Sequence, residues 1–112
     1  MLPKTHRLTA RGDFKEVFQG TARTRSGPFQ LVCRKNNLQN NRFGFVVGLI
    51  VSKKATQRNK LRRRLHGIVQ KVFPSLKTGY DCVIRVYPGA ADLSFSEIQE
   101  HTEALFSKVK IL

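Results

Sequence analysis

The chain is poor in acidic residues, in cysteine and in long hydrophobic runs. Asp and Glu together account for 7 of its 112 residues, and there are two cysteines. The longest apolar run, residues 43–51, has nine residues and contains two glycines, so it is too short to cross a bilayer. The N-terminal segment has no apolar signal core. We therefore expect a cytoplasmic protein without a membrane partner.

The two cysteines form no recognisable metal or redox motif. Cys33 and Cys82 show neither CxxC nor Cys/His spacing, and each lies in an apolar, strand-like segment. Buried free thiols are therefore expected, rather than a disulfide or a zinc pair. His6, His66 and His101 are isolated from one another, without metal-ligand spacing. The sequence predicts no metal site in this chain.

No pattern indicates that the chain breaks bonds itself. It has no Ser-His-acid arrangement and no glycine-rich phosphate motif. Glu97, Glu100 and Glu103 recur every third residue, where capping and a favourable first helical turn explain them better than catalysis does. We expect no catalytic residue, and a stand-alone metal-dependent nuclease is the least favoured function.

Positive charge is abundant and unevenly distributed. The formal net charge is +14, and residues 1–64 hold all of the excess, with sixteen Lys or Arg against Asp13 and Glu16. Residues 65–112 are balanced, with five basic and five acidic residues. Such self-repulsion favours a polyanionic partner, and a phosphate backbone suits Lys and Arg because it releases condensed counter-ions. Membrane binding is the weaker interpretation, because it usually needs an amphipathic anchor.

The local patterns predict one α+β domain over residues 1–112. An apolar content of 40% with eight Phe is enough for a core. The turn cluster NNLQNN at 36–41 predicts a hairpin between the strands on either side of it. Ser94 and Glu97 form a capping-box pattern. The expected elements are a helix capped by Thr9 and running to Gln19, an extra edge strand near 21–26, strands over 28–35 and 42–51, a helix over 55–73, a strand over 80–87, and a helix from Ser94.

The helix over 55–73 combines dense positive charge with an apolar stripe. Seven of the twelve residues from Lys53 to Arg64 are Lys or Arg. A helical wheel places Arg58 and Arg62 beside a groove at the open face of the sheet, whereas Lys60 and Arg63 point outward. No acid lies at i±4, and cations near a helix N-terminus are unfavourable, so stability alone does not explain them. The stripe itself is Leu61, Leu65, Ile68 and Val72.

A neighbouring cleft could accept single-stranded RNA, which needs cations and flat side chains for its bases. Phe14 and Phe18 on the first helix would face the second side of the strand over 28–35. That both Phe are plain core residues remains an alternative. The expected cleft residues are Arg11, Phe14, Lys15, Phe18, Gln30, Val32 and Arg34.

Four segments together resemble the bacterial ribonuclease P protein family: DFKEVF at 13–18, FGFVVGLIVSKK at 43–54, RNKLRRRL at 58–65 and YDCVIRV at 80–86. The resemblance covers nearly the whole chain. Its most specific element is SKK followed by the family's RNR-type helix, which Arg58 and Asn59 match. Lys60 departs from it, because lysine keeps the charge but loses the bidentate fork.

The resemblance implies an α/β sandwich with a mostly antiparallel sheet and a left-handed β-α-β crossover, against the usual right-handed preference. It implies the protein component of an endoribonuclease whose RNA subunit, with Mg²⁺, removes the 5′ leader of precursor tRNA. The partners would be one ribonuclease P RNA and precursor tRNA, with no other protein required and Mg²⁺ held mainly by RNA and substrate. The alternative is a ribosomal or assembly protein that binds rRNA without processing it. The catalytic RNA would contact Lys53, Lys54, Arg58, Asn59, Lys60, Arg62 and Arg63, and the cleft would hold the leader.

Overall fold

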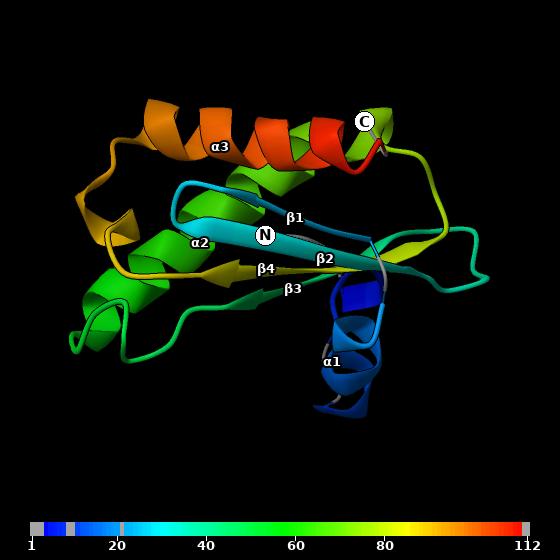
Figure 1. Ribbon diagram of the computed structural model, residues 1–112, viewed down its shortest axis with the longest axis horizontal. Helices are drawn as coiled ribbons and strands as arrows, with labels where there is room; N and C mark the ends of the chain where they lie inside the picture. The colour runs from blue at the N-terminus through cyan, green and yellow to red at the C-terminus, as the bar shows by residue number, and fades with distance from the viewer. Residues whose placement is uncertain (1–3, 9–10, 21, 111–112) are drawn as a thin grey trace.

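The protein is built around a four-stranded mixed sheet (Figure 1). The computed structural model describes residues 4–8, 11–20 and 22–110. The strand order is β1-β2-β4-β3, with β1/β2 and β2/β4 antiparallel and β3/β4 parallel. The sheet is therefore mostly antiparallel, as expected. The elements are η1 (Lys4–His6), α1 (Arg11–Phe18), β1 (Ala22–Ser26), β2 (Phe29–Lys35), β3 (Arg42–Val46), α2 (Ala55–Val72), η2 (Phe73–Ser75), β4 (Tyr80–Val86), η3 (Ala90–Asp92) and α3 (Phe95–Lys108).

The hairpin predicted across residues 36–41 is wrong, because β4 lies between β2 and β3. Ile84 of β4 pairs with Leu31 on one side and with Phe45 on the other. The side chains of β4 from Cys82 to Ile84 are 0% exposed, and such a strand gains most at the centre of a sheet. The hairpin of this fold joins β1 to β2 through Gly27, whose φ of +54° suits a turn. The extra edge strand near 21–26 is confirmed as β1.

Strand β3 is shorter than predicted. It ends at Val46, which pairs with Arg85, one residue before β4 itself ends. The segment after Val46 therefore has no neighbouring strand to pair with. Leu49 and Ile50, predicted within the strand, are 68% and 70% exposed.

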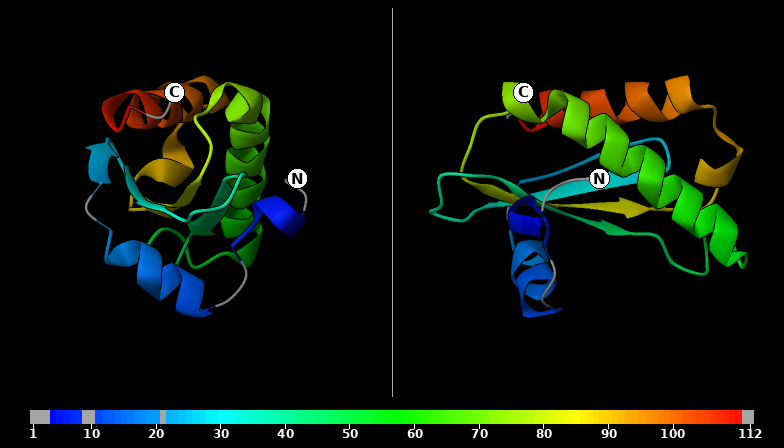
Figure 2. Two further views of the ribbon diagram at one scale, coloured as in Figure 1. Left: turned by 90° about the vertical axis from the view of Figure 1, so that its right-hand side faces the viewer. Right: turned by 180° about the vertical axis from the view of Figure 1, so that it is seen from behind.

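The connection from β3 through α2 to β4 is left-handed, as the resemblance implied. When both strands are viewed pointing upward with α2 in front of the sheet, β4 lies to the left of β3 (Figures 1 and 2). Parallel strands joined by a helix are otherwise right-handed almost without exception. This crossover places the N-terminal end of α2 beside the edge strand β3.

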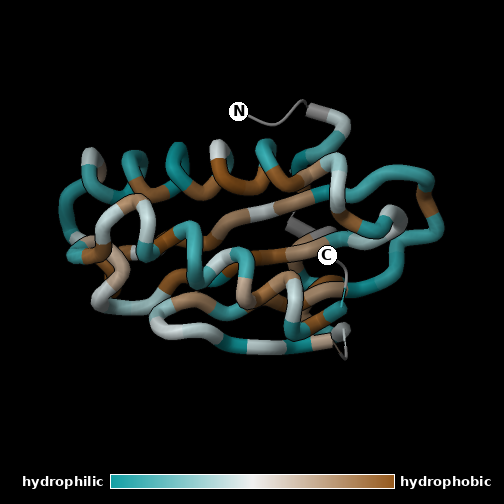
Figure 3. Tube along the Cα trace, turned by 90° about the horizontal axis from the view of Figure 1, so that it is seen from above, coloured by the Kyte–Doolittle hydropathy of each residue, from teal (hydrophilic) through white to brown (hydrophobic). Residues whose placement is uncertain are grey.

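Two hydrophobic clusters lie on opposite faces of the sheet. The larger one packs α2 and α3 against the sheet, while the smaller one lies under α1. In Figure 3 the long helix at the upper edge, α2, turns its hydrophobic residues toward the sheet and its hydrophilic residues outward. The smaller cluster consists of Leu8, Val17, Val32 and Val83, with Phe14, Phe18 and Val46 partly buried against it.

A capping box fixes the start of α3. Ser94 caps α3 by accepting from the Glu97 backbone N–H at 3.2 Å, and the Glu97 carboxylate accepts from the Ser94 N–H at 3.1 Å. The predicted capping box is therefore confirmed. The cap proposed for Thr9 falls outside the described residues. Among the described residues, no helix has the length and apolar character needed to span a membrane.

Cys33 and Cys82 are free and buried, as predicted. They pair directly across β2 and β4, with their Sγ atoms 2.9 Å apart. Burial, together with the hydrogen bond from Cys33, raises the pKa of the Cys82 thiol well above its usual range. Both thiols therefore belong to the core.

Candidate RNA-binding surface

Helix α1 and the sheet form the aromatic part of the surface. Val17 is buried and anchors α1, whereas Phe14 and Phe18 are half-buried against the smaller cluster. The ring of Phe14 lies against β3 at Gly44, where a Cβ would stand 2.4 Å from Cε1 of the ring. Glycine at this position therefore allows the close approach of ring and backbone. The two Phe belong partly to the core and partly to the surface.

Arg85 completes this aromatic surface, although the sequence analysis missed it. Its guanidinium carbon lies 4.3 Å from the centroid of the Phe18 ring, within cation–π range. Arg85 lies two residues after Val83 on β4, and alternate strand residues share a face. That alternation was the available signal, since Val83 belongs to the cluster under α1.

The other predicted cleft residues differ in how far they reach the surface. Gln30 is half-buried, and its Oε1 accepts from the Tyr87 hydroxyl at 3.3 Å. Val32 is 0% exposed and forms the floor beneath α1. Arg34 is exposed and lies 3.9 Å from the Glu16 carboxylate. Lys15 is also exposed, and the side chain of Arg11 falls outside the described part.

The basic helix places its charges as the wheel indicated. The apolar stripe of α2 is buried at Leu61, Leu65 and Ile68. Arg58 and Arg62 are half-buried on its shoulder. The remaining predicted RNA contacts are exposed, namely Lys53, Lys54, Asn59, Lys60 and Arg63.

Arg58 and Arg62 also hold the loop that precedes α2. Arg58 donates from Nη1 to the Ser52 carbonyl oxygen at 2.9 Å, and Arg62 donates from Nη2 to the Val47 carbonyl oxygen at 3.0 Å. Arg62 Nη1 donates to Asn59 Oδ1 at 3.0 Å. These two arginines are thus fixed by the fold, with further N–H groups left for a ligand.

The first half of α2 is an uncompensated cationic surface. Its N-terminus has no acidic residue in the first turn and no side-chain cap. Among the described residues, the basic side chains from Lys53 to Arg64 have no acidic group within 4.0 Å. Arg42, by contrast, binds the Asp81 carboxylate through Nε at 2.8 Å and Nη2 at 2.6 Å. Fixed cations without acids favour a phosphate ligand.

A small recess joins the two parts of this surface. It has a volume of about 190 Å³ and lies where α1, β3 and α2 meet residues 7 and 8, which follow η1. Phe14 and Phe45 line it together with Arg7, Arg62 and His66. The basic helix α2 and the aromatic surface of α1 therefore border the same recess.

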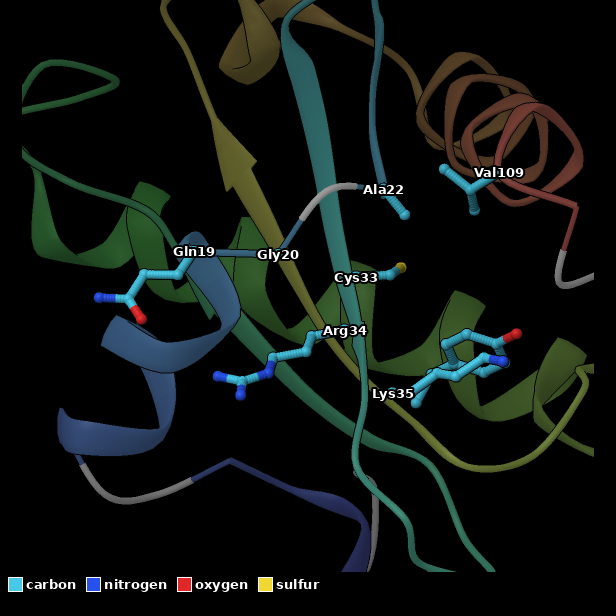
Figure 4. A pocket seen from close by; sticks show the side chains of 8 residues that line it. Gln19, Gly20, Ala22, Cys33, Arg34, Lys35 and Val109 are labelled. Carbon is cyan, nitrogen blue, oxygen red and sulfur yellow. The ribbon is translucent and has the colours of Figure 1, made fainter.

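A larger recess of about 570 Å³ lies at the far end of α1 (Figure 4). Figure 4 shows Arg34 pointing toward α1, whereas Cys33 points to the other side of β2. Lys35 and Tyr80 also line it. The sequence alone does not predict this recess, because its walls come from segments distant along the chain.

The described residues do not fit a magnesium site. Within them, no group of three or more His, Cys, Asp or Glu side chains is arranged to hold a metal ion. Asp81 is already bound by Arg42 and by Asn36, whose Nδ2 donates at 2.9 Å. No step is therefore assigned to a metal on this chain.

The fold and surface define an α+β protein of an RNA-binding class, in which the cationic helix α2 lies beside the half-buried Phe rings of α1. The sequence model of the Ribonuclease P family matches residues 2–110. The ribonuclease P protein component of Synechocystis sp. is 37% identical over 112 residues, covering 99% of this chain and 90% of the relative. The chain belongs to the ribonuclease P protein family, the protein components of an endoribonuclease.

Solved structures agree with this fold. The RNase P protein from Thermotoga maritima superposes with a TM-score of 0.80 at 28% identity, covering 88% of this chain and 93% of that one. A mutant Staphylococcus aureus RNase P protein gives a TM-score of 0.90, covering 97% and 92% of the two chains. At 19% identity, the second likeness concerns the fold alone.

Proposed function

We propose that this chain binds ribonuclease P RNA through the first half of α2 and the 5′ leader of precursor tRNA through the cleft between α1 and the sheet. The observation that carries the proposal is that Arg62 of α2 and Phe14 of α1 line the same recess. Two RNA ligands held on adjoining surfaces would be brought together by the protein.

The docking role rests on the exposed cations in the first half of α2 and immediately before it. Lys53, Lys54, Lys60 and Arg63 point away from the core, so they can reach phosphates without unfolding the helix. Arg58 and Arg62 contribute guanidinium groups whose direction is already fixed by loop carbonyls. Preorganised donors lose less side-chain freedom on binding. The structured RNA would therefore meet a rigid array of charge.

The leader-binding role rests on the half-buried rings of α1. Phe14 and Phe18 offer partial faces on which bases can stack, and stacking tolerates any sequence. Arg85, Gln30 and Lys15 border these rings with charged or hydrogen-bonding groups. Val32 contributes as the buried floor that supports the rings.

The cleavage chemistry belongs to the RNA in this proposal. Mg²⁺ would be held by ribonuclease P RNA and the substrate, and it would supply the activated water and charge stabilisation for the hydrolysis. The protein chain would bind and position both RNA molecules, with one protein per RNA. Because precursor tRNA is processed in the bacterial cytoplasm, the proposal places the chain there.

A reconstitution assay tests the proposal. The purified protein is mixed with ribonuclease P RNA and precursor tRNA at low Mg²⁺, and 5′ cleavage is followed. We expect the protein to stimulate cleavage, and to raise affinity for precursor tRNA more than for the mature tRNA without a leader. Absence of stimulation would overturn the proposal. Cleavage by the protein alone would instead indicate a stand-alone nuclease.

A further inference from the structure

The recess lined by residues 7 and 8, β3 and α2 contains two buried polar atoms without hydrogen-bond partners among the described residues. Within the described residues, Arg7 Nε and His66 Nδ1 are the buried side-chain nitrogen or oxygen atoms that lack a hydrogen-bond partner. Both residues line the recess, and His66 is only 8% exposed. Leaving a buried polar group unsatisfied costs about 1–3 kcal/mol. A ligand that accepts hydrogen bonds would remove this cost.

The chemistry of the lining selects an anion. Arginine Nε–H can only donate, and imidazole Nδ1 can donate as N–H, so both atoms suit an acceptor ligand. Arg62 on α2 and Arg7, just after η1, are the charged side chains that line the recess with His66, and no acidic residue lines it. The N-terminal amino group adds a further positive charge that acts on His66. On the β3 side, His66 contacts the uncharged ring of Phe45, and the centroids of the two rings are 4.5 Å apart. Phe14 closes the recess from α1.

The electrostatics of His66 agree with this selection. Burial, followed by the charges of the N-terminal amino group and of Arg7, lowers the pKa of His66 below its usual value of 6.5. An anion beside the imidazole would act in the opposite direction, because it stabilises the charged form. Occupancy of the recess and protonation of His66 are therefore linked.

From these observations we infer that the recess is a phosphate-binding subsite built from Arg7, Arg62 and His66. Its volume of about 190 Å³ admits a phosphate group and part of a sugar, but not a large ligand. A backbone phosphate of bound RNA is the assigned source, which rests on the proposed function. Asn59 is a positioning residue here, because its Oδ1 accepts from Arg62 Nη1 at 3.0 Å.

The direct test follows the His66 imidazole by NMR during a pH titration. Inorganic phosphate and a short single-stranded RNA are the two probes, each compared with the free protein. We expect the pKa of His66 to rise with both probes, and with RNA at the lower concentration. His101 is the internal control, since it lies on α3 and its Nδ1 is bound to Ser26 Oγ at 2.8 Å. An unchanged His66 pKa with both probes would overturn the subsite.

Two conservative variants separate this subsite from general RNA binding. Arg7→Gln and His66→Gln should weaken RNA affinity about tenfold, the loss of one charged hydrogen bond. Arg7→Gln should also reduce the slope of log affinity against log salt by about one. Lys71→Gln, an exposed change in the last turn of the same helix, is the control and should leave RNA affinity almost unchanged. Circular dichroism confirms that each variant is folded, and the NMR titration needs no variant.

The outcomes distinguish this inference from the proposed function. If the wild-type protein stimulates cleavage while phosphate and RNA leave His66 unmoved, the subsite fails and the proposed function stands. If both probes raise the His66 pKa but ribonuclease P RNA is not stimulated, the proposed function fails and the subsite stands. A response to inorganic phosphate without a response to RNA would overturn the assigned source.

Discussion

The ring of Phe14 and the backbone of Gly44 are in such close contact that a Cβ on Gly44 would stand 2.4 Å from Cε1. Gly44→Ala must therefore displace helix α1 or the Phe14 ring that it carries. We expect a destabilisation of about 1–3 kcal/mol from overpacking, measured by chemical denaturation, and weaker binding of leader RNA. Gly48→Ala is the matched control, because a Cβ there meets no atom within 4 Å. Equal effects of the two variants would contradict the prediction.

Arg63→Ala should weaken binding to ribonuclease P RNA without destabilising the fold. Arg63 is exposed on the outer face of α2. We expect the slope of log affinity against log salt to fall by about one, measured by filter binding at several salt concentrations. Lys71→Ala removes one charge from the other end of the same helix and should leave the slope unchanged. An unaltered slope in Arg63→Ala would show that Arg63 does not touch phosphate.

Arg58→Ala should affect both RNA binding and stability. This arginine donates to the Ser52 carbonyl oxygen at 2.9 Å, so its loss leaves the loop before α2 less well held. We expect a fall of about 1 kcal/mol in the free energy of unfolding, in addition to a reduced salt slope. Thermal and urea unfolding measure the first effect. A stability equal to that of Arg63→Ala would argue against the loop contact.

Phe18→Ala should lower affinity for precursor tRNA more than for mature tRNA. Removing a ring that stacks on a base costs about 1–3 kcal/mol, and here the Arg85 guanidinium loses its ring partner as well. Phe95→Ala is the control, since Phe95 is 47% exposed on α3 and distant from α1. The measurement is binding of both tRNAs to the reconstituted holoenzyme. A loss of the same size for both tRNAs would place the leader elsewhere.

Glu97→Gln should change how the free energy of unfolding depends on pH in acidic solution. Hydrogen bonds from the Ser94 backbone and side chain lower the pKa of Glu97 below its ordinary value of 4.5. A lowered folded pKa contributes stability that is present above the unfolded value and is lost as the pH falls through the folded one. We therefore expect wild type and variant to differ above about pH 4.5 and to converge in more acidic solution. Glu100→Gln is the control, and urea unfolding across the pH range is the measurement.

Much of this fold was predictable because its signals are local. The capping box at Ser94 and the alternation of β2 depend on residues close together in the chain. The partner of β3 did not follow from such signals, since NNLQNN indicates a turn but not which strand lies beside it. The buried character of Cys82–Ile84 was visible, yet its consequence, a central β4, depends on the whole sheet. The left-handed crossover came from resemblance alone.

The candidate site divides in the same way. The helical period predicts that Leu61 and Leu65 lie on the buried face of α2. It therefore also predicts that Arg63 points outward. His66 was interpreted as isolated, because its neighbour Arg7 is 59 positions earlier in the sequence. A helical spacing of four from Arg62 was the one available signal. Contacts between distant segments thus account for what the sequence analysis missed.

Strand β4, which lies between β2 and β3, is also the last of the four strands to be synthesised. Neither β2 nor β3 can form its backbone hydrogen bonds to β4 before residues 80–86 leave the ribosome, because β4 pairs with both strands. The cationic helix precedes β4, so its charges emerge while the sheet beneath it is still open. Closing such distant pairs costs loop entropy and slows folding. In the proposed function, an RNA partner on this helix would therefore also reduce the mutual repulsion of its charges before the sheet is complete.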